Sequence, residues 1–174
     1  ESGRSNDLFP WKAVVDDRNV EGATAVAVPG TVDGIGQAHA RFGRMPWADL
    51  LRPAEGLARE GMLVDWYAAL MIASATRSLS RDPDAAALFL EDGQWPTIAG
   101  WTALSDKRLD QGVMADTLAR LGEAGYRDFY EGEIAAKLVA DLRAKGSAMT
   151  LEDLSSYSAT ISDPLEIAYR EGRV

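Results

Sequence analysis

The single histidine, His39, is the residue through which a Ser-His-Asp or Cys-His catalytic set would have to work. Apolar residues at 32, 35, 38 and 42 recur around it at helical spacing, which places His39 on the apolar stripe of a predicted helix. The sequence has no second histidine and no cysteine, so a multi-histidine metal site and a cysteine nucleophile are both excluded. The pattern favours a packed, hydrogen-bonded histidine.

The 27 acidic side chains are scattered along the chain. Asp16 and Asp17 are adjacent, and Asp82 and Asp84 are separated by one residue. Both pairs fall in predicted turns or helix caps, where aspartate is common for conformational reasons. The glycines of residues 30–36 do not follow the Gly-x-Gly-x-x-Gly order of a dinucleotide-binding loop. The sequence therefore predicts no catalytic residue, no metal ligand and no cofactor site in this chain.

Arg4 stands among small residues in Ser2-Gly3-Arg4-Ser5. A guanidinium on a tight turn can clamp a carboxylate through two parallel hydrogen bonds. Arg4 is thus a candidate substrate-binding residue, with a simply solvated arginine as the alternative.

The composition sets bounds on the partners. A chain of 174 residues has the length of one domain, and its formal net charge of −9 argues against a nucleic acid or an anionic membrane as partner. Residues 66–73 form the longest nearly apolar run, far below the roughly 18 residues that span a bilayer. The polar start without methionine and the abrupt end at Val174 suggest a piece of a longer protein.

Apolar spacing predicts a mainly α fragment with short terminal strands. Residues 1–30 are expected to form an extended arm with a short strand or extended segment over Thr24–Val28, and residues 31–157 a helical region. Residues 158–174 are expected to form a strand, because apolar side chains alternate there with polar or small ones: Leu165, Ile167 and Tyr169.

Capping residues and breakers locate the predicted helices. Pro53 interrupts an apolar stripe and predicts either one kinked helix or two short helices. Gly34 and Gly36, near a helix start, indicate that another backbone lies close. Residues 94–108 are interpreted as an ordered loop pinned by its aromatic side chains. The predicted N-caps are Thr31, Asp65, Asp82, Asp110 and Thr150.

Five segments resemble motifs of the γ-glutamyltranspeptidase family, also called γ-glutamyltransferase or glutathione hydrolase. They occur in the same order as in the family and at about the same spacing. Residues 28–34 resemble its PGTVAG segment, and residues 41–47 its "-FG-LPW-" turn. Residues 51–61 resemble "L-PA…LA-EG", residues 128–135 "-FY-G-IA-", and residues 150–157 "T-EDL--Y".

The resemblance implies an N-terminal-nucleophile hydrolase with an αββα sandwich fold. Such precursors cleave themselves into a large and a small subunit, and the new amino-terminal Thr attacks a γ-glutamyl amide such as glutathione. The match covers only the middle of the large subunit, so the implied partners are the remainder of that subunit and the small subunit. By this resemblance the chain is a non-catalytic fragment that requires no cofactor.

The same resemblance implies one substrate contact. In the family, a large-subunit arginine in an Arg-Glu-x-Ala-Pro segment, upstream of the Pro-Gly-Thr segment, pairs with the glutamyl α-carboxylate. Residues 2–6 correspond to that segment but depart from its pattern. Arg4 is the residue that could take this role.

Other readings stay open. The chain could be an independent helical binding module, or a self-contained enzyme that uses His39 and a nearby carboxylate. Within the family, transferase, glutathione hydrolase and cephalosporin-type acylase activities are all compatible with these residues. Periplasmic and cytoplasmic locations are both compatible as well.

Overall fold

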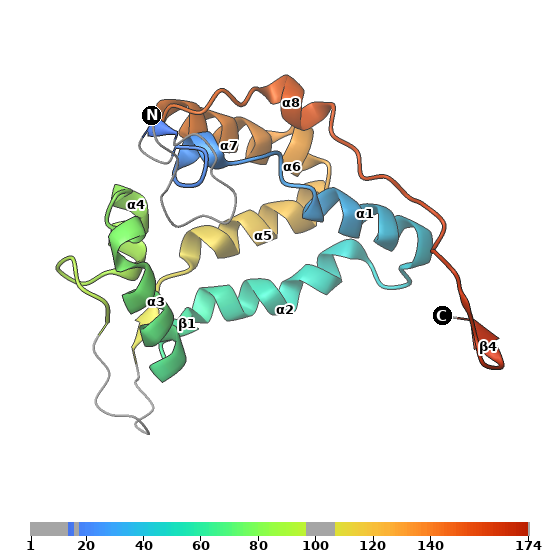
Figure 1. The fold of residues 1–174 in the computed structure, drawn as a ribbon, viewed down its shortest axis with the longest axis horizontal. Helices are drawn as coiled ribbons and strands as arrows, with labels where there is room; N and C mark the ends of the chain where they lie inside the picture. Colours follow the sequence, from blue (N-terminus) through green and yellow to red (C-terminus); the bar gives the residue numbers. More distant parts are fainter. Residues whose placement is uncertain (1–13, 16–17, 97–106, 174) are drawn as a thin grey trace.

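The computed structural model describes residues 14–15, 18–96 and 107–173 and is mainly helical, as predicted (Figure 1). The 3-10 turn η2 (Ala23–Ala25) precedes the helices α1 (Thr31–Phe42), α2 (Trp47–Glu60), α3 (Trp66–Leu79), α4 (Pro83–Phe89), α5 (Gly112–Ala124), α6 (Asp128–Glu131), α7 (Glu133–Ala144) and α8 (Leu151–Ser155). The strands are β1 (Met62–Leu63), β2 (Arg108–Leu109), β3 (Ala168–Tyr169) and β4 (Gly172–Arg173). Within these residues no helix is long and apolar enough to cross a membrane.

Helices α2 and α5 run side by side through the middle of the molecule (Figure 1). The Trp47 indole N–H donates to the Leu121 carbonyl at 2.9 Å, which joins the start of α2 to α5. The helices approach closely at Gly122, where a Cβ would lie in ordinary van der Waals contact with the Ala48 Cα at 3.6 Å. Arg59 of α2 forms an exposed ion pair with Asp116 of α5 at 2.9 Å.

Two separate hydrophobic cores flank this helix pair. The first lies among α6, α7 and α8 and contains Tyr130, Ala135, Val139, Leu142, Met149 and Leu154. The second lies among α3, β1 and β2 and contains Val64, Ala69, Ile72 and Leu109. Antiparallel pairing of β1 with β2, with Met62 opposite Leu109, closes the second core.

The short-range signals in the sequence predict helix ends well. Asp65 and Asp82 cap α3 and α4, and Thr150 forms a capping box with Asp153 at the start of α8. Asp110 accepts a hydrogen bond from the Gly112 N–H at 2.8 Å, although the N-cap position itself is Gln111.

The predicted N-cap Asp110 is wrong, since Gln111 holds that position, and four further local predictions are wrong. Thr24–Val28 is not a strand, because η2 occupies its start and no described segment pairs with the extended residues that follow. Thr31 is the first residue of α1 rather than its N-cap, which is Gly30. Helix α2 continues through Pro53, so the alternative of two short helices is wrong. Most of residues 158–174 are not in a strand, since only 168–169 and 172–173 pair with each other.

The β3–β4 hairpin stands at the end of a long tail, away from both cores (Figure 1). The apolar side chains predicted to be half-buried on a strand are exposed, and Leu165 is 97% exposed. A hairpin of two short strands is only marginally stable without further strands or a helix packed against it. This segment therefore lacks its packing partner within the described residues. Of the two aromatic side chains predicted to pin the 94–108 loop, Trp101 lies outside the described residues, and Trp95 is 46% exposed.

Candidate functional site

Three of the five family-like segments meet around the turn that leads into α1. Tyr130 of α6 is fully buried, and its hydroxyl donates to the Pro29 carbonyl at 2.7 Å. The same hydroxyl accepts the Asp33 N–H at 3.0 Å. One phenol thus fixes both ends of the turn over residues 29–33, across about a hundred residues of sequence.

Tyr157, just after α8, completes the contact with this turn. Its ring stacks on Tyr130, with centroids 5.7 Å apart and planes 15° from parallel. A Cβ at Gly30 would lie 2.2 Å from the Tyr157 hydroxyl oxygen, so only glycine fits at this position. The Pro-Gly pair is therefore a packing requirement as well as a turn signal.

Asp33 is a buried carboxylate, 1% exposed, that binds one residue of its own helix and two other segments. Its Oδ1 accepts from the Arg127 guanidinium at 3.0 Å. Its Oδ2 accepts from the Gln37 amide and from the Ala159 backbone N–H, both at 2.7 Å. Burial alone would raise the pKa of Asp33, but these hydrogen bonds and the guanidinium charge outweigh it and hold the pKa below its usual value.

Arg127 extends the cluster to α8. Its guanidinium donates to the Tyr157 carbonyl at 3.1 Å and the Ser155 carbonyl at 3.2 Å, and pairs with Glu131. It also lies over the Tyr130 ring, 5.0 Å from the centroid. We call Asp33, Arg127, Tyr130 and Tyr157 the turn clamp. It joins α1, α6 and the end of α8.

Asp128 is the second buried carboxylate and anchors the start of α7. It accepts from Arg120 at 2.7 Å and from the backbone N–H groups of Glu133 and Ile134 at 3.4 and 3.1 Å. A Cβ at Gly132 would lie 2.1 Å from the Asp128 Oδ1, which explains that glycine. The Arg120 guanidinium, followed by these backbone hydrogen bonds, lowers the pKa of Asp128 against the opposing effect of burial.

The two carboxylates make stability depend on pH. Because the pKa of each is depressed in the folded state, each contributes stability above the ordinary aspartate pKa and loses it as the pH falls through the folded value. We expect the free energy of unfolding, measured with urea, to fall below about pH 5. In the Asp33→Asn/Asp128→Asn variant, that decrease should be much shallower. An equally steep decrease in the variant would contradict this assignment.

His39 lies in a packed environment, as predicted. Its Nε2 is 2.8 Å from the Met45 carbonyl oxygen, and its ring packs against Trp47 at 5.3 Å. Gly43 is the C-cap of α1 with φ −66°, so it ends α1 without the left-handed geometry of a usual glycine stop. Glycine is needed there because a Cβ would lie 2.3 Å from the His39 ring. In the described part of the chain no carboxylate bonds to His39, so the reading of a self-contained enzyme built on it has no geometric support.

The structure places the other candidates as follows. Arg4, Asp16 and Asp17 lie outside the described residues. Asp82 and Asp84 lie at the start of α4, where Asp82 is the cap and Asp84 is exposed. Among the described residues, no group of three or more His, Cys, Asp or Glu side chains could hold a metal ion.

Gly34 and Gly36 differ from the prediction. A Cβ at Gly36 would lie 2.2 Å from the Tyr126 ring, so a side chain rather than a backbone causes the close approach. At Gly34 the nearest atom, the Ala159 Cβ, would be 3.9 Å away, which is ordinary contact.

The turn clamp was not predicted from the sequence, although Asp33, Tyr130 and Tyr157 all belong to family-like segments. The occurrence of all three residues in family-like segments was the signal that could have identified them.

The comparisons agree with the motifs. The family model described as Gamma-glutamyltranspeptidase matches residues 3–174. The Acylase ACY 1 proenzyme of Pseudomonas sp. (strain V22) is 37% identical over 166 residues, covering 95% of this chain and 28% of that protein. Glutathione hydrolase 2 of Arabidopsis thaliana is 32% identical over 167 residues, covering 92% and 28%.

Solved structures show the same architecture. Helicobacter pylori gamma-glutamyltranspeptidase superposes with a TM-score of 0.81 at 26% identity, over 92% of this chain and 44% of that one. Cephalosporin acylase from Bacillus halodurans gives 0.75 at 27% identity, over 88% and 28%. The chain thus spans 28% of the length of the two curated relatives named above. It belongs to the gamma-glutamyltranspeptidase family.

Proposed function

We propose that this chain is the central, non-catalytic part of the large subunit of a γ-glutamyltransferase or glutathione hydrolase. The observation that carries the proposal is the turn clamp, because residues of three family-like segments bond and pack there around one turn. The Tyr130 hydroxyl bonds to backbone groups, and the Asp33 carboxylate bonds to Arg127, Gln37 and Ala159. The fragment supports catalysis and supplies no nucleophile.

In this proposal the nucleophile is an amino-terminal Thr outside the chain, in the small subunit. Its hydroxyl attacks the γ-glutamyl carbonyl, and its own α-amine takes the hydroxyl proton and passes it to the nitrogen of the substrate amide. The C–N bond then breaks, the substrate's amine leaves, and a γ-glutamyl ester of the Thr remains. Water or an amino acid then accepts the γ-glutamyl group and frees the Thr. Arg4 is the residue we propose for binding the glutamyl α-carboxylate through a bidentate ion pair.

In the same proposal, the C-terminal segment that carries the β3–β4 hairpin packs within an αββα sandwich. Ile161, Leu165, Ile167 and Tyr169 are all more than half exposed in the described chain, and the β3–β4 hairpin has open edges. We propose that a sheet formed by the remainder of the two subunits pairs with this hairpin and buries those side chains. This packing supplies the additional strands that a short hairpin needs.

A cephalosporin-type acylase is the second candidate. It is favoured by the 37% identity to the Acylase ACY 1 proenzyme, compared with 32% to Glutathione hydrolase 2. Both activities hydrolyse an amide through an acyl-enzyme, and they differ in the acyl group that the pocket accepts.

The test is turnover by the protein extended to the full length of its relatives. We expect hydrolysis of a γ-glutamyl anilide, with faster release of the aniline when an acceptor amino acid is added. The 174-residue chain alone should release none. Turnover of a cephalosporin side-chain amide with none of the anilide would select the acylase. Turnover by the isolated chain, or by neither protein on either substrate, would contradict the proposal.

A further inference from the structure

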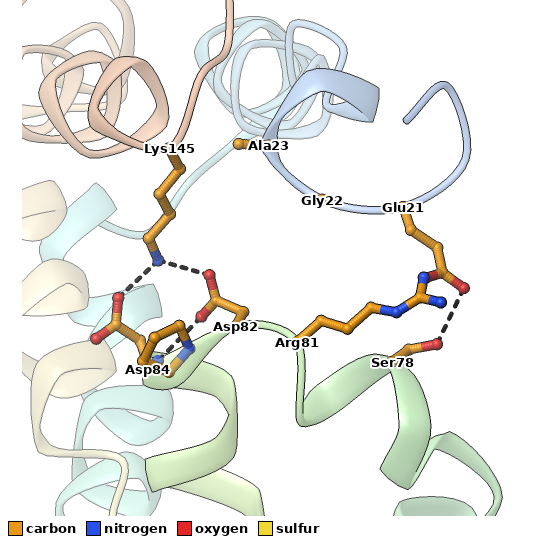
Figure 2. A pocket seen from close by; sticks show the side chains of 9 residues that line it. Glu21, Gly22, Ala23, Ser78, Arg81, Asp82, Asp84 and Lys145 are labelled. Carbon is orange, nitrogen blue, oxygen red and sulfur yellow. Dashed lines mark hydrogen bonds and ion pairs between the residues drawn. The ribbon is translucent and has the colours of Figure 1, made fainter. Parts of the chain in front are cut away.

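A cleft lined mostly by charged and polar residues separates the α3–α4 end of the molecule from α7 and η2. It has a volume of about 610 Å³ and is lined by Glu21, Gly22, Ala23, Ser78, Arg81, Asp82, Pro83, Asp84 and Lys145 (Figure 2). These residues come from three segments far apart in the sequence. No residue belongs to both of the two hydrophobic cores on its sides, as far as the described chain extends.

Charged and polar side chains bridge the cleft at two places. On one side, Lys145 Nζ lies 2.6 Å from Asp84 Oδ2 and 2.9 Å from Asp82 Oδ2 (Figure 2). On the other side, Glu21 pairs with Arg81 and accepts from the Ser78 hydroxyl at 3.1 Å. Among the described residues that line the cleft, the apolar ones, Ala23 and Pro83, are small. The contacts that join the lining side chains across the cleft are ion pairs and one hydroxyl hydrogen bond.

The Lys145 side of the bridge is held in place from both ends. The Asp82 Oδ1 caps α4 by accepting from the N–H groups of Asp84 and Ala85 at 3.0 and 2.9 Å, which fixes the carboxylate whose other oxygen pairs with Lys145. Lys145 is the C-cap of α7, where a positive charge is favourable. The ion pair forms between groups that local structure has already placed.

The covalent connection on the other side of this lobe is narrow. In the part of the chain that the structure describes, β1, which follows Gly61, and β2, which precedes Asp110, connect α3 and α4 to α2 and α5. Gly61 has φ +79°, and its carbonyl accepts from the Arg108 guanidinium at 2.9 Å. Two paired strands of two residues each can act as a hinge for α3 and α4 when the ion pairs across the cleft are broken.

We propose that α3 and α4 form a hinged lobe that the Lys145–Asp82–Asp84 and Glu21–Arg81 ion pairs hold closed against α7 and η2. We call these two sets of ion pairs the charge latch. Partly exposed ion pairs are weakened by salt, whereas apolar contacts are not. Closure of the lobe should consequently depend on ionic strength and on the charge of residue 145.

The chain has no cysteine, so pairs of spin labels can be placed specifically. Labels at Ala87→Cys on α4 and Ala140→Cys on α7, both exposed positions, report the width of the cleft. We expect a narrow distance distribution at about 0.1 M NaCl and a several-fold loss of that population at about 1 M, where the Debye length falls to roughly 3 Å. Lys145→Met should be open at both salt concentrations.

Two variants serve as matched controls. Lys145→Arg keeps the charge and should restore the closed population. Lys137→Met removes another lysine of α7, whose ion pair with Glu133 at 2.6 Å stays within the helix, and should leave the distribution unchanged. If Lys145→Met does not give the native circular dichroism spectrum, Asp84→Asn and the salt titration of the unsubstituted chain carry the test. The proposal would be overturned if the distance distribution stayed narrow and unchanged at both salt concentrations and in the variants that alter the charge latch.

Discussion

Replacing Asp33 by alanine is expected to lower the free energy of unfolding by about 3 kcal/mol, at the lower end of what breaking a buried ion pair costs. The value is at the lower end because the Arg127 side chain is 32% exposed and water can partly solvate it once its partner is lost. The Ala159 N–H and the Gln37 amide lose their acceptor in the same variant. Urea unfolding at pH 7 measures the loss.

The matched control is Asp49→Ala. Asp49 also accepts from an arginine, Arg52 at 2.6 Å, but both side chains are exposed on the surface of α2. An exposed pair of this kind contributes less than about 1 kcal/mol. Equal losses for Asp33→Ala and Asp49→Ala would show that the turn clamp does not hold this part of the molecule together.

Replacing Gly36 by alanine is expected to destabilise the chain by about 1–3 kcal/mol, the usual cost of overpacking. Intrinsic helix propensity alone favours alanine in the middle of α1 by about 1 kcal/mol. Packing decides the sign, since the new Cβ would lie 2.2–2.5 Å from three atoms of the Tyr126 ring. That ring also contacts Trp47, edge to face at 6.1 Å, so moving it disturbs the start of α2 as well.

Gly56→Ala is the control for this prediction. Gly56 lies within α2 and is exposed, and no atom lies within 4 Å of a Cβ at this position. The propensity gain therefore remains, and we expect stabilisation by about 0.5–1 kcal/mol. The two glycine-to-alanine variants should change the urea midpoint in opposite directions. Stabilisation by both would mean that Tyr126 moves away at little cost.

Signals that act within one turn of helix were readable in the sequence. Asp65, Asp82 and Thr150 cap helices through hydrogen bonds to residues two or three positions later, so their neighbours suffice to predict them. Gly61 and Gly125 end helices with positive φ. Glycine adopts this geometry without a steric penalty, so the residue type is enough to predict such an end.

Contacts between distant residues were not readable in this way. Asp33 and Arg127 are 94 positions apart, and nothing local marks them as partners. Thr24–Val28 has the composition of a strand, but a strand also needs a partner to bond with, and the described chain provides none. The family resemblance selected the right segments, but their meeting point appeared only in three dimensions.

The central claim is that these 174 residues are an uncut supporting segment of a self-cleaving enzyme whose nucleophile lies elsewhere. Mass spectrometry of the protein extended to the full length of its relatives tests this claim directly. We predict two polypeptides after maturation: a larger one that contains residues 1–174 intact, and a smaller one that begins with Thr beyond Val174. A single uncut polypeptide, or a cleavage within residues 1–174, would contradict the account.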